Sequence, residues 1–226
     1  MKKLIFVLFS LFFTSLVSAH MAHYNNYEKL EMDILRNGEI IGYNHYFFNK
    51  KKDETIVTNQ IKFSVKLLGA TIFQIEGYGE EKYQNDQLIS FNSKTLQNDK
   101  EKFVNLVFDK NSNNFSIKGS SFTGEASINN IIGNWWNHKI LQSDSQISPI
   151  SGSIKKQVVT FIGKEKIEQY GKIYNVERFK LKSQDMSLPK DKRLDFDIWY
   201  DKKNHLIIRV AYSRMGNWEY RLKNFK

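Results

Sequence analysis

The stretch Leu30-Glu31-Met32-Asp33-Ile34-Leu35-Arg36-Asn37-Gly38-Glu39-Ile40-Ile41 determines the fold class of this chain. Apolar Leu30, Met32 and Ile34 alternate with charged residues, so we expect an extended strand with one buried face and one solvent-exposed face. Asn37-Gly38 favours the positive φ angles of a two-residue turn, and residues 39–49, rich in Ile, Tyr and Phe, return as a second strand. The stretch therefore predicts an antiparallel hairpin.

The same period of two recurs on both sides of a long irregular segment. It predicts strands over residues 55–67, 71–83, 87–96, 102–108 and 114–118, and then over 156–162, 164–169, 172–181, 193–201, 205–214 and 218–223. About ten strands with almost no helix favour an all-β protein built on one strongly curved antiparallel sheet. Such a sheet forms an unclosed or a closed barrel more readily than a sandwich.

The alternation fails between residues 119 and 153, where Ser, Gly and Asn become frequent. The side chains of Trp135, Trp136, Ile140 and Leu141 recur near helical spacing, which predicts one short covering helix within residues 134–142. A connector of this length inside a compact domain is often a binding loop or a lid.

The N-terminus has the pattern of an export signal. Two lysines follow Met1, an apolar run extends over residues 4–16, and Val17-Ser18-Ala19 offers small residues for cleavage. Because 13 residues are too few for a helix that crosses a bilayer, no transmembrane segment is predicted. The sequence thus predicts a signal peptide at residues 1–19, cleavage near Ala19, and a single β-rich domain over residues 20–226 that is periplasmic or secreted.

Composition excludes several chemistries. The chain has no cysteine, which excludes a lipoprotein anchor, disulfides, thiolate catalysis and cysteine-rich zinc sites. Its net charge of +10 comes from scattered lysines and arginines, a distribution that favours a solvated surface over nucleic-acid binding. No phosphate-binding loop or Gly-x-Ser-x-Gly elbow occurs, so no cofactor and no catalytic residue are predicted.

Several motifs resemble an uncharacterised family of exported bacterial proteins, which are domains of unknown function. They are Asn134-Trp135-Trp136-Asn137, the hairpin over residues 163–174, Asp197-Ile198-Trp199-Tyr200-Asp201, Glu219-Tyr220-Arg221-Leu222, and, near the N-terminus, Asn37-Gly38-Glu39-Ile40-Ile41-Gly42. The resemblance implies an exported β-rich fold and no activity. More distantly, the pattern is similar to unclosed barrels that carry lipoproteins or lipids, a likeness of fold alone.

Two further chemistries remain as hypotheses. Asp195, Asp197 and Asp201, with Glu219 across the hairpin, offer paired carboxylates for a hydrolase, although alternation favours a wet face on which they pair with arginines. Cleavage after Ala19 would leave His20 as the first residue, able to chelate copper with His23 or a more distant histidine. A frayed terminus is the expectation there, and no closely spaced ligand set predicts a metal site.

The leading functional prediction is a non-enzymatic exported protein that binds a lipid or another apolar or amphipathic envelope ligand in its curved sheet. We expect the ligand to contact six residues: Trp135, Trp136, His138, Ile140, Trp199 and Tyr200. For the helix that carries the two tryptophans, simple completion of the core is the default expectation. A pocketless scaffold that docks another envelope component is the alternative, and a hydrolase built on the Asp197 region is a third hypothesis. The sequence leaves the oligomeric state open.

Overall fold

The computed structural model describes residues 20–226, and the predicted signal peptide, residues 1–19, lies outside this part. Strands β1 (Lys29–Arg36) and β2 (Glu39–Lys51) pair antiparallel. The turn between them places Asn37 at φ +51° and Gly38 at φ +87°. The hairpin predicted from the Asn-Gly dipeptide is confirmed.

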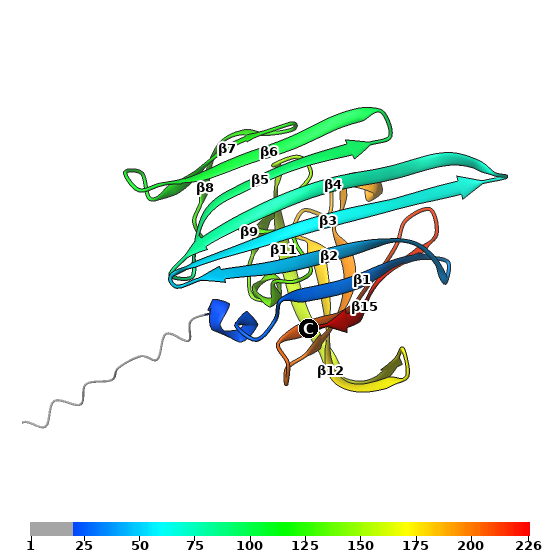
Figure 1. Ribbon diagram of the computed structural model, residues 1–226. Coiled ribbons are helices and arrows are strands. Elements are labelled where there is room, and N and C mark those ends of the chain that lie inside the picture. The colour runs from blue at the N-terminus through cyan, green and yellow to red at the C-terminus, as the bar shows by residue number, and fades with distance from the viewer. Residues whose placement is uncertain (1–19) are drawn as a thin grey trace, which may run out of the picture.

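The first half of the chain continues from this hairpin as an antiparallel meander (Figure 1). Its further strands are β3 (Glu54–Leu67), β4 (Ala70–Gln84), β5 (Gln87–Gln97), β6 (Lys100–Asp109), β7 (Asn114–Gly119) and β8 (Thr123–Ser127). Tight turns with residues of positive φ join them, among them Leu68-Gly69 and Asn85-Asp86. Alternation along the sequence predicted β3 to β7 closely.

The second half is a meander of β11 (Ile154–Gln169), β12 (Lys172–Ser183), β13 (Asp195–Asp201), β14 (Leu206–Ser213) and β15 (Asn217–Phe225). The two strands predicted over residues 156–169 are one strand, β11, because a bulge between Phe161 and Gly163 shifts the register without ending the pairing. A short 3₁₀ helix, η3 (Lys190–Lys192), precedes β13.

The connector between the halves differs from its prediction. It contains β9 (Ile131–Ile132), the 3₁₀ helix η2 (His138–Leu141) and β10 (Ser145–Ile147). The predicted covering helix over residues 134–142 shrinks to four residues because Asn134 and Trp136 direct their polar atoms to a buried carboxylate on β4. Within residues 20–226 the sheet has fifteen strands, whereas the sequence predicted about ten, and β8, β9 and β10 are strands that it did not predict.

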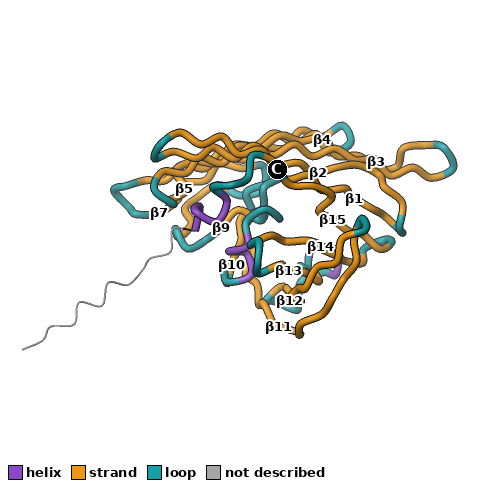
Figure 2. Tube along the Cα trace, turned by 60° about the horizontal axis from the view of Figure 1, so that its bottom comes forward, coloured by secondary structure: helices purple, strands orange, loops and turns teal. Residues whose placement is uncertain are grey.

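The fifteen strands form one strongly curved sheet in the order β8-β7-β6-β5-β4-β3-β2-β1-β15-β14-β13-β12-β11-β10-β9. All neighbours are antiparallel except β9 and β10. The sheet is unclosed, and only residues 128–130 join its two edge strands, β8 and β9. Figure 2 shows β2–β5 above β11–β14, with the connector loops between the two layers.

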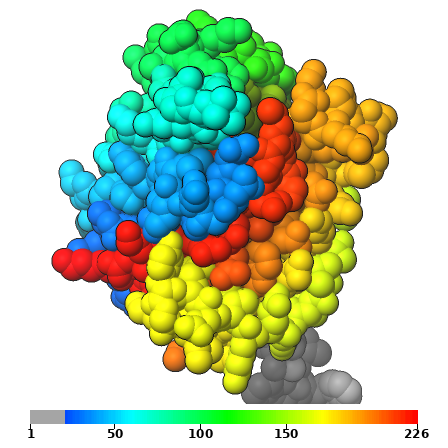
Figure 3. Space-filling model, turned by 90° about the vertical axis from the view of Figure 1, so that its right-hand side faces the viewer, coloured from blue at the N-terminus to red at the C-terminus, as the bar shows by residue number. Residues whose placement is uncertain are grey.

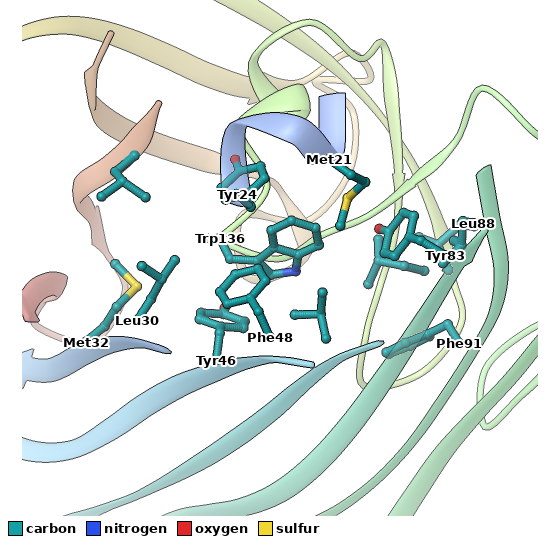
Figure 4. Close-up of a cluster of buried hydrophobic side chains, with 14 of the residues drawn as sticks. Met21, Tyr24, Leu30, Met32, Tyr46, Phe48, Tyr83, Leu88, Phe91 and Trp136 are labelled. Atoms are coloured by element: carbon teal, nitrogen blue, oxygen red, sulfur yellow. The ribbon is translucent and has the colours of Figure 1, made fainter. Parts of the chain in front are cut away.

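The core lies between these layers. Trp136 is 1% exposed and lies between Tyr24 and Phe48 in Figure 4, with Tyr83 edge-on to its ring. A second buried cluster surrounds Ile140 and the inner faces of β13 and β14, and a third surrounds Trp218. Edge-to-face aromatic contacts of this kind add to the free energy gained from burial.

The segment after the predicted cleavage point is docked in this core. Helix η1 (His20–Tyr24) buries Met21 and Tyr24, and Lys50 of β2 donates hydrogen bonds to the carbonyl oxygens of Tyr24, Asn25 and Tyr27 at 2.5–2.7 Å. The expectation of a frayed terminus is therefore wrong from Met21 onward, because a fully buried tyrosine anchors the segment. No helix within residues 20–226 is long and apolar enough to cross a membrane.

Candidate functional site

A cleft of about 540 Å³ opens between the two layers of the sheet. One wall comes from β2–β5, and the other comes from the β12–β13 loop with β13, β14 and β15. The aromatic rings on its walls are those of Tyr46, Tyr78, Phe91, Trp135, Phe196, Tyr212 and Tyr220. In Figure 3 the orange segment around residue 190 faces the green strands across a gap, and a red segment near the C-terminus lies between it and the cyan strands.

Rings on this cleft pack against one another. The Trp135 ring meets Phe196 edge-on, with ring centroids 5.1 Å apart, and Phe196 in turn meets Tyr212 at 5.3 Å. Trp135, Phe196 and Tyr212 are only half-buried, although they face the interior of a curved sheet. The apolar wall is thus both rigid and accessible.

Glycines and amides form the opposite wall. Gly77 and Gly79 line the cleft from β4, where any side chain would shorten the distance across it. Asn59 Nδ2 donates to Asn44 Oδ1 at 2.6 Å, and Asn44 Nδ2 donates to the Tyr46 hydroxyl at 2.8 Å. The wall therefore carries a few fixed polar groups within an otherwise apolar surface.

Positive charge is concentrated at one end of the cleft, where Lys182, Lys190, Arg193 and Arg214 are lining residues and Asp195 is the one acidic lining residue. Asp185, outside the lining, also interacts with Arg193. Arg193 Nε donates to the Leu188 carbonyl at 2.5 Å, and Arg214 Nη2 donates to the Arg193 carbonyl at 3.0 Å. These bonds fix the two arginines in place. The cleft thus combines an aromatic interior with a cationic end.

A buried carboxylate lies under the connector. Glu81 of β4 is 2% exposed. Its Oε1 accepts hydrogen bonds from Asn134 Nδ2 at 2.5 Å and Trp136 Nε1 at 2.8 Å, and its Oε2 accepts one from the Tyr83 hydroxyl at 2.6 Å. Burial raises the pKa of Glu81, and the three donors act against that rise. This carboxylate fixes the path of the connector.

Three histidines gather at the other side of the connector. His23, His138 and His205 each bring one ring nitrogen within 4.8 Å of the other two. Burial, with the nearby His205 and His23, lowers the pKa of His138 to about 4, which leaves this imidazole neutral at pH 7. Burial and the neighbouring His23 also lower the pKa of His205.

The six residues predicted to bind a ligand lie in different places. Trp135 lines the cleft, whereas Trp136 and Ile140 are in the core. His138 and Tyr200 belong to the histidine cluster, with ring centroids 5.3 Å apart. Trp199 points to the opposite face of β13, where its Nε1 donates to Glu165 at 2.5 Å. Since neighbours on a strand face opposite sides, Trp199 and Tyr200 do not share one pocket.

Sequence reasoning missed most of the cleft. Phe196, Tyr212 and Tyr220 are inward residues of three neighbouring strands, and alternation alone offered a way to find them. The cationic end combines residues from β12, the following loop and the β14–β15 turn, which no local pattern links. His23 and His205 form their cluster only after the chain folds.

The acidic residues of the hydrolase hypothesis form ion pairs or cap a turn. Asp197 contacts Arg178 and Lys180, both at 2.8 Å. Burial acts against the change, but these two cations lower the pKa of Asp197, the opposite of what a general acid needs. Glu219 pairs with Arg221 at 2.7 Å, and Asp201 accepts hydrogen bonds from Lys203 and Asn204 in the next turn.

Comparisons with known proteins give a family and a fold. A family model described as a domain of unknown function, DUF6134, matches residues 32–223. No curated protein matches the chain.

Among solved structures, a beta-barrel-like protein of the DUF1849 domain of unknown function from Brucella abortus is similar, with 10% identity and a TM-score of 0.58 over 88% of this chain and 95% of that one. A Bacteroides fragilis protein with a YmcC-like fold has 10% identity, a TM-score of 0.36 and coverage of 88% and 94%. A DUF1329 family protein from Desulfovibrio piger has 11% identity, a TM-score of 0.22 and coverage of 91% and 88%. The first of these likenesses concerns the fold alone.

Proposed function

Because the chain belongs to the DUF6134 family of unknown function, we propose its function from its own geometry: it binds one amphipathic molecule with an apolar body and an anionic head. The membership confirms the resemblance to an uncharacterised family. The observation that carries the proposal is the cleft, whose half-buried aromatic wall ends in a cluster of lysines and arginines.

The size and lining of the cleft support this assignment. Ligand pockets in proteins commonly have volumes of about 300–1,000 Å³ and apolar walls with a few placed polar groups. A volume of about 540 Å³ suits one acyl chain or a compact amphipath. The fixed arginines at one end would orient an anionic head, while the Trp135 wall would contact the apolar body. Binding without chemical conversion is the simplest role for such a cleft.

The proposal includes the compartment. Residues 20–226 form the mature, single β-rich domain after cleavage near Ala19, and the protein acts in the periplasm or outside the cell. There it would meet lipids and other amphipathic envelope molecules. Mass spectrometry under native conditions, on protein purified after export from its own cells, should show one bound amphipath per chain. Protein that is consistently empty and binds no amphipath in solution would support a pocketless scaffold instead.

Truncating the apolar wall should weaken binding. We expect Trp135→Ala to raise the Kd for a dansyl-labelled fatty acid about 10- to 100-fold, because a buried aromatic side chain contributes about 1.5–3 kcal/mol. Fluorescence titration measures this change. Phe161→Ala is the matched control, since Phe161 is 52% exposed on β11 and lies outside the cleft. Equal losses in both variants would contradict the assignment of the cleft.

Removing the positive charges of Arg193 and Arg214 should weaken only the binding of ligands that have an anionic head group. We expect the double variant Arg193→Gln with Arg214→Gln to weaken fatty-acid binding about tenfold at low salt, because each partly exposed ion pair contributes about 1 kcal/mol or less. Binding of the corresponding fatty alcohol should not change. Lys202→Gln with Lys203→Gln, in the turn after β13, is the control for net charge. A similar loss for acid and alcohol would show that the arginines do not contact the head.

A further inference from the structure

Three histidines from distant parts of the chain meet beside helix η1. His23 lies in η1, His138 is the first residue of η2, and His205 lies between β13 and β14. One ring nitrogen from each is within 4.8 Å of the other two. These residues are separated by 115 and 67 positions in sequence, so no local pattern accounts for three imidazoles at one point.

The rings are arranged compactly. His23 stacks on His205 with ring centroids 3.8 Å apart, and His138 lies 5.5 Å from each of them. A tetrahedral zinc ion with Zn–N bonds of about 2.0–2.1 Å holds its ligand nitrogens about 3.4 Å apart. The widest separation here, 4.8 Å at most, therefore has to shorten by about 1.4 Å, shared among three side chains that can rotate.

Tyrosine hydroxyl groups form hydrogen bonds with two of these imidazole rings. The Tyr24 hydroxyl lies 2.7 Å from Nδ1 of His138, and the Tyr200 hydroxyl lies 3.0 Å from Nδ1 of His205. Tyr24 also accepts a hydrogen bond from the His138 backbone N–H and lies 3.4 Å from the His205 carbonyl, to which it donates. Metal-binding histidines characteristically have one ring nitrogen fixed in this way by a hydrogen bond while the other binds the ion.

The helix that carries His23 is anchored on both sides of it. After His23, the Lys50 ammonium group donates hydrogen bonds to the carbonyl oxygens of Tyr24, Asn25 and Tyr27. Before it, the Met21 N–H donates to Asp86 Oδ1 at 2.7 Å. Tyr24 is fully buried. The backbone that carries His23 is therefore held in place before an ion binds, which lowers the entropic cost of binding.

We propose that His23, His138 and His205 bind one late first-row divalent cation, Zn²⁺ or Cu²⁺. Imidazole suits both ions, and three histidines with a fourth, exogenous ligand are an established coordination set. His23 and His205 are half-buried, so the fourth position is reached from solvent. The ion joins η1 to η2 and to the β13–β14 turn.

None of the three histidines lines the cleft, so the site is independent of the function proposed above. His20, the sequence-based copper candidate, has its side chain outside the described part of the chain.

Calorimetric titration of Zn²⁺ into the processed protein, stripped with EDTA, tests the site. We expect one ion per chain and a higher Tm in its presence, because an ion that binds only the folded state stabilises it. His23→Phe keeps the stacked ring, and His205→Asn keeps a residue that tolerates the φ of +56° found there. Both should weaken binding beyond the roughly 10- to 100-fold that loss of an outer partner costs. Titration with Cu²⁺, followed by electron paramagnetic resonance, distinguishes the two ions and should show nitrogen ligands.

His45→Phe is the matched control. His45 also stacks on an aromatic ring, that of Tyr43 at 4.5 Å, but it lies on β2 outside the cluster. It should leave binding unchanged. Tyr200→Phe keeps all three histidines and should weaken binding about 10- to 100-fold, so it serves even if His23→Phe fails to fold. Absence of binding by the wild type, or equal affinity in wild type, His23→Phe and His205→Asn, would overturn the proposal.

Discussion

Glu81→Ala should lower the free energy of unfolding by at least about 3 kcal/mol, since each buried donor left without a partner costs about 1–3 kcal/mol. The substitution removes the acceptor of three donors at once: Asn134 Nδ2, Trp136 Nε1 and the Tyr83 hydroxyl. It also leaves a cavity under Trp136, the largest fully buried side chain in the described core. Urea unfolding followed by tryptophan fluorescence measures the loss.

Glu81→Gln is the control that separates hydrogen bonding from charge. The glutamine carbonyl can accept from Asn134 and Trp136, and its amide can donate to the Tyr83 oxygen. We expect the free energy of unfolding of this variant to lie within about 1 kcal/mol of the wild type at pH 7, or above it, because a neutral amide keeps a partner for each of the three groups and avoids the cost of burying a charge. A loss as large as that of the alanine variant would show that the carboxylate charge itself is required.

The difference in stability between the wild type and Glu81→Gln should also depend on pH. Burial raises the pKa of Glu81 above its ordinary value of 4.5, so between pH 4.5 and the raised pKa the folded state holds a proton that the unfolded state has lost. The contribution of Glu81 is therefore fully present below pH 4.5 and falls as pH rises, by up to about 1.4 kcal/mol per pH unit. The stability of the wild type relative to Glu81→Gln should fall over this window. A difference that rises with pH would contradict the assigned direction.

Gly42→Ala should cost about 3 kcal/mol, at the upper end of the range for overpacking. A Cβ atom at Gly42 would lie 2.1 Å from the Lys62 carbonyl oxygen and 2.6 Å from the Cα atom of its partner, Phe63. Both are backbone atoms, so β2 and β3 would have to separate where β2 also pairs with β1 at a bulge. Urea unfolding measures the change, and near-ultraviolet circular dichroism reports on the packing of Phe63 against Trp218.

Gly163→Ala is the matched substitution. Gly163 is also a strand glycine beside a bulge, but a Cβ there would meet no atom within 4 Å. We expect its stability to stay the same or to rise by about 0.5 kcal/mol, because alanine restricts the unfolded chain more than glycine does. Equal destabilisation of both variants would mean that crowding at Gly42 is not the cause.

Alternation and turn chemistry were sufficient for most of the sheet. The dipeptide Asn37-Gly38 placed the first hairpin, and the period of two located β3–β7 and β12–β15 to within a few residues. The short strands β8, β9 and β10 were missed because two to five residues cannot show a period, and their pairing depends on contacts across the molecule. The covering helix predicted over residues 134–142 was wrong for the same reason. Hydrogen bonds from Asn134 and Trp136 to Glu81, which is distant in sequence, determine the path of this segment.

The candidate sites were less predictable. Residues 134–138 were singled out correctly as an unusual segment, but their side chains separate: Trp135 to the cleft, Trp136 to Glu81 and His138 to the histidine cluster. Glu81 itself reads as an ordinary charge in the run Glu80-Glu81-Lys82. Its burial follows only from the position of β4 beneath the connector, which is a property of the folded sheet.

The central seam of the sheet, where β1 pairs with β15, affects the order in which the molecule can fold. The Lys226 carbonyl accepts hydrogen bonds from the N–H groups of Glu28 and Lys29, so the seam joins residues almost two hundred positions apart. Each meander can form from local contacts, whereas the seam must close a very long loop and should form late. Until β15 emerges during synthesis, β1 exposes an unpaired edge. A chaperone that covers β1 during that interval would protect the protein at its most aggregation-prone stage.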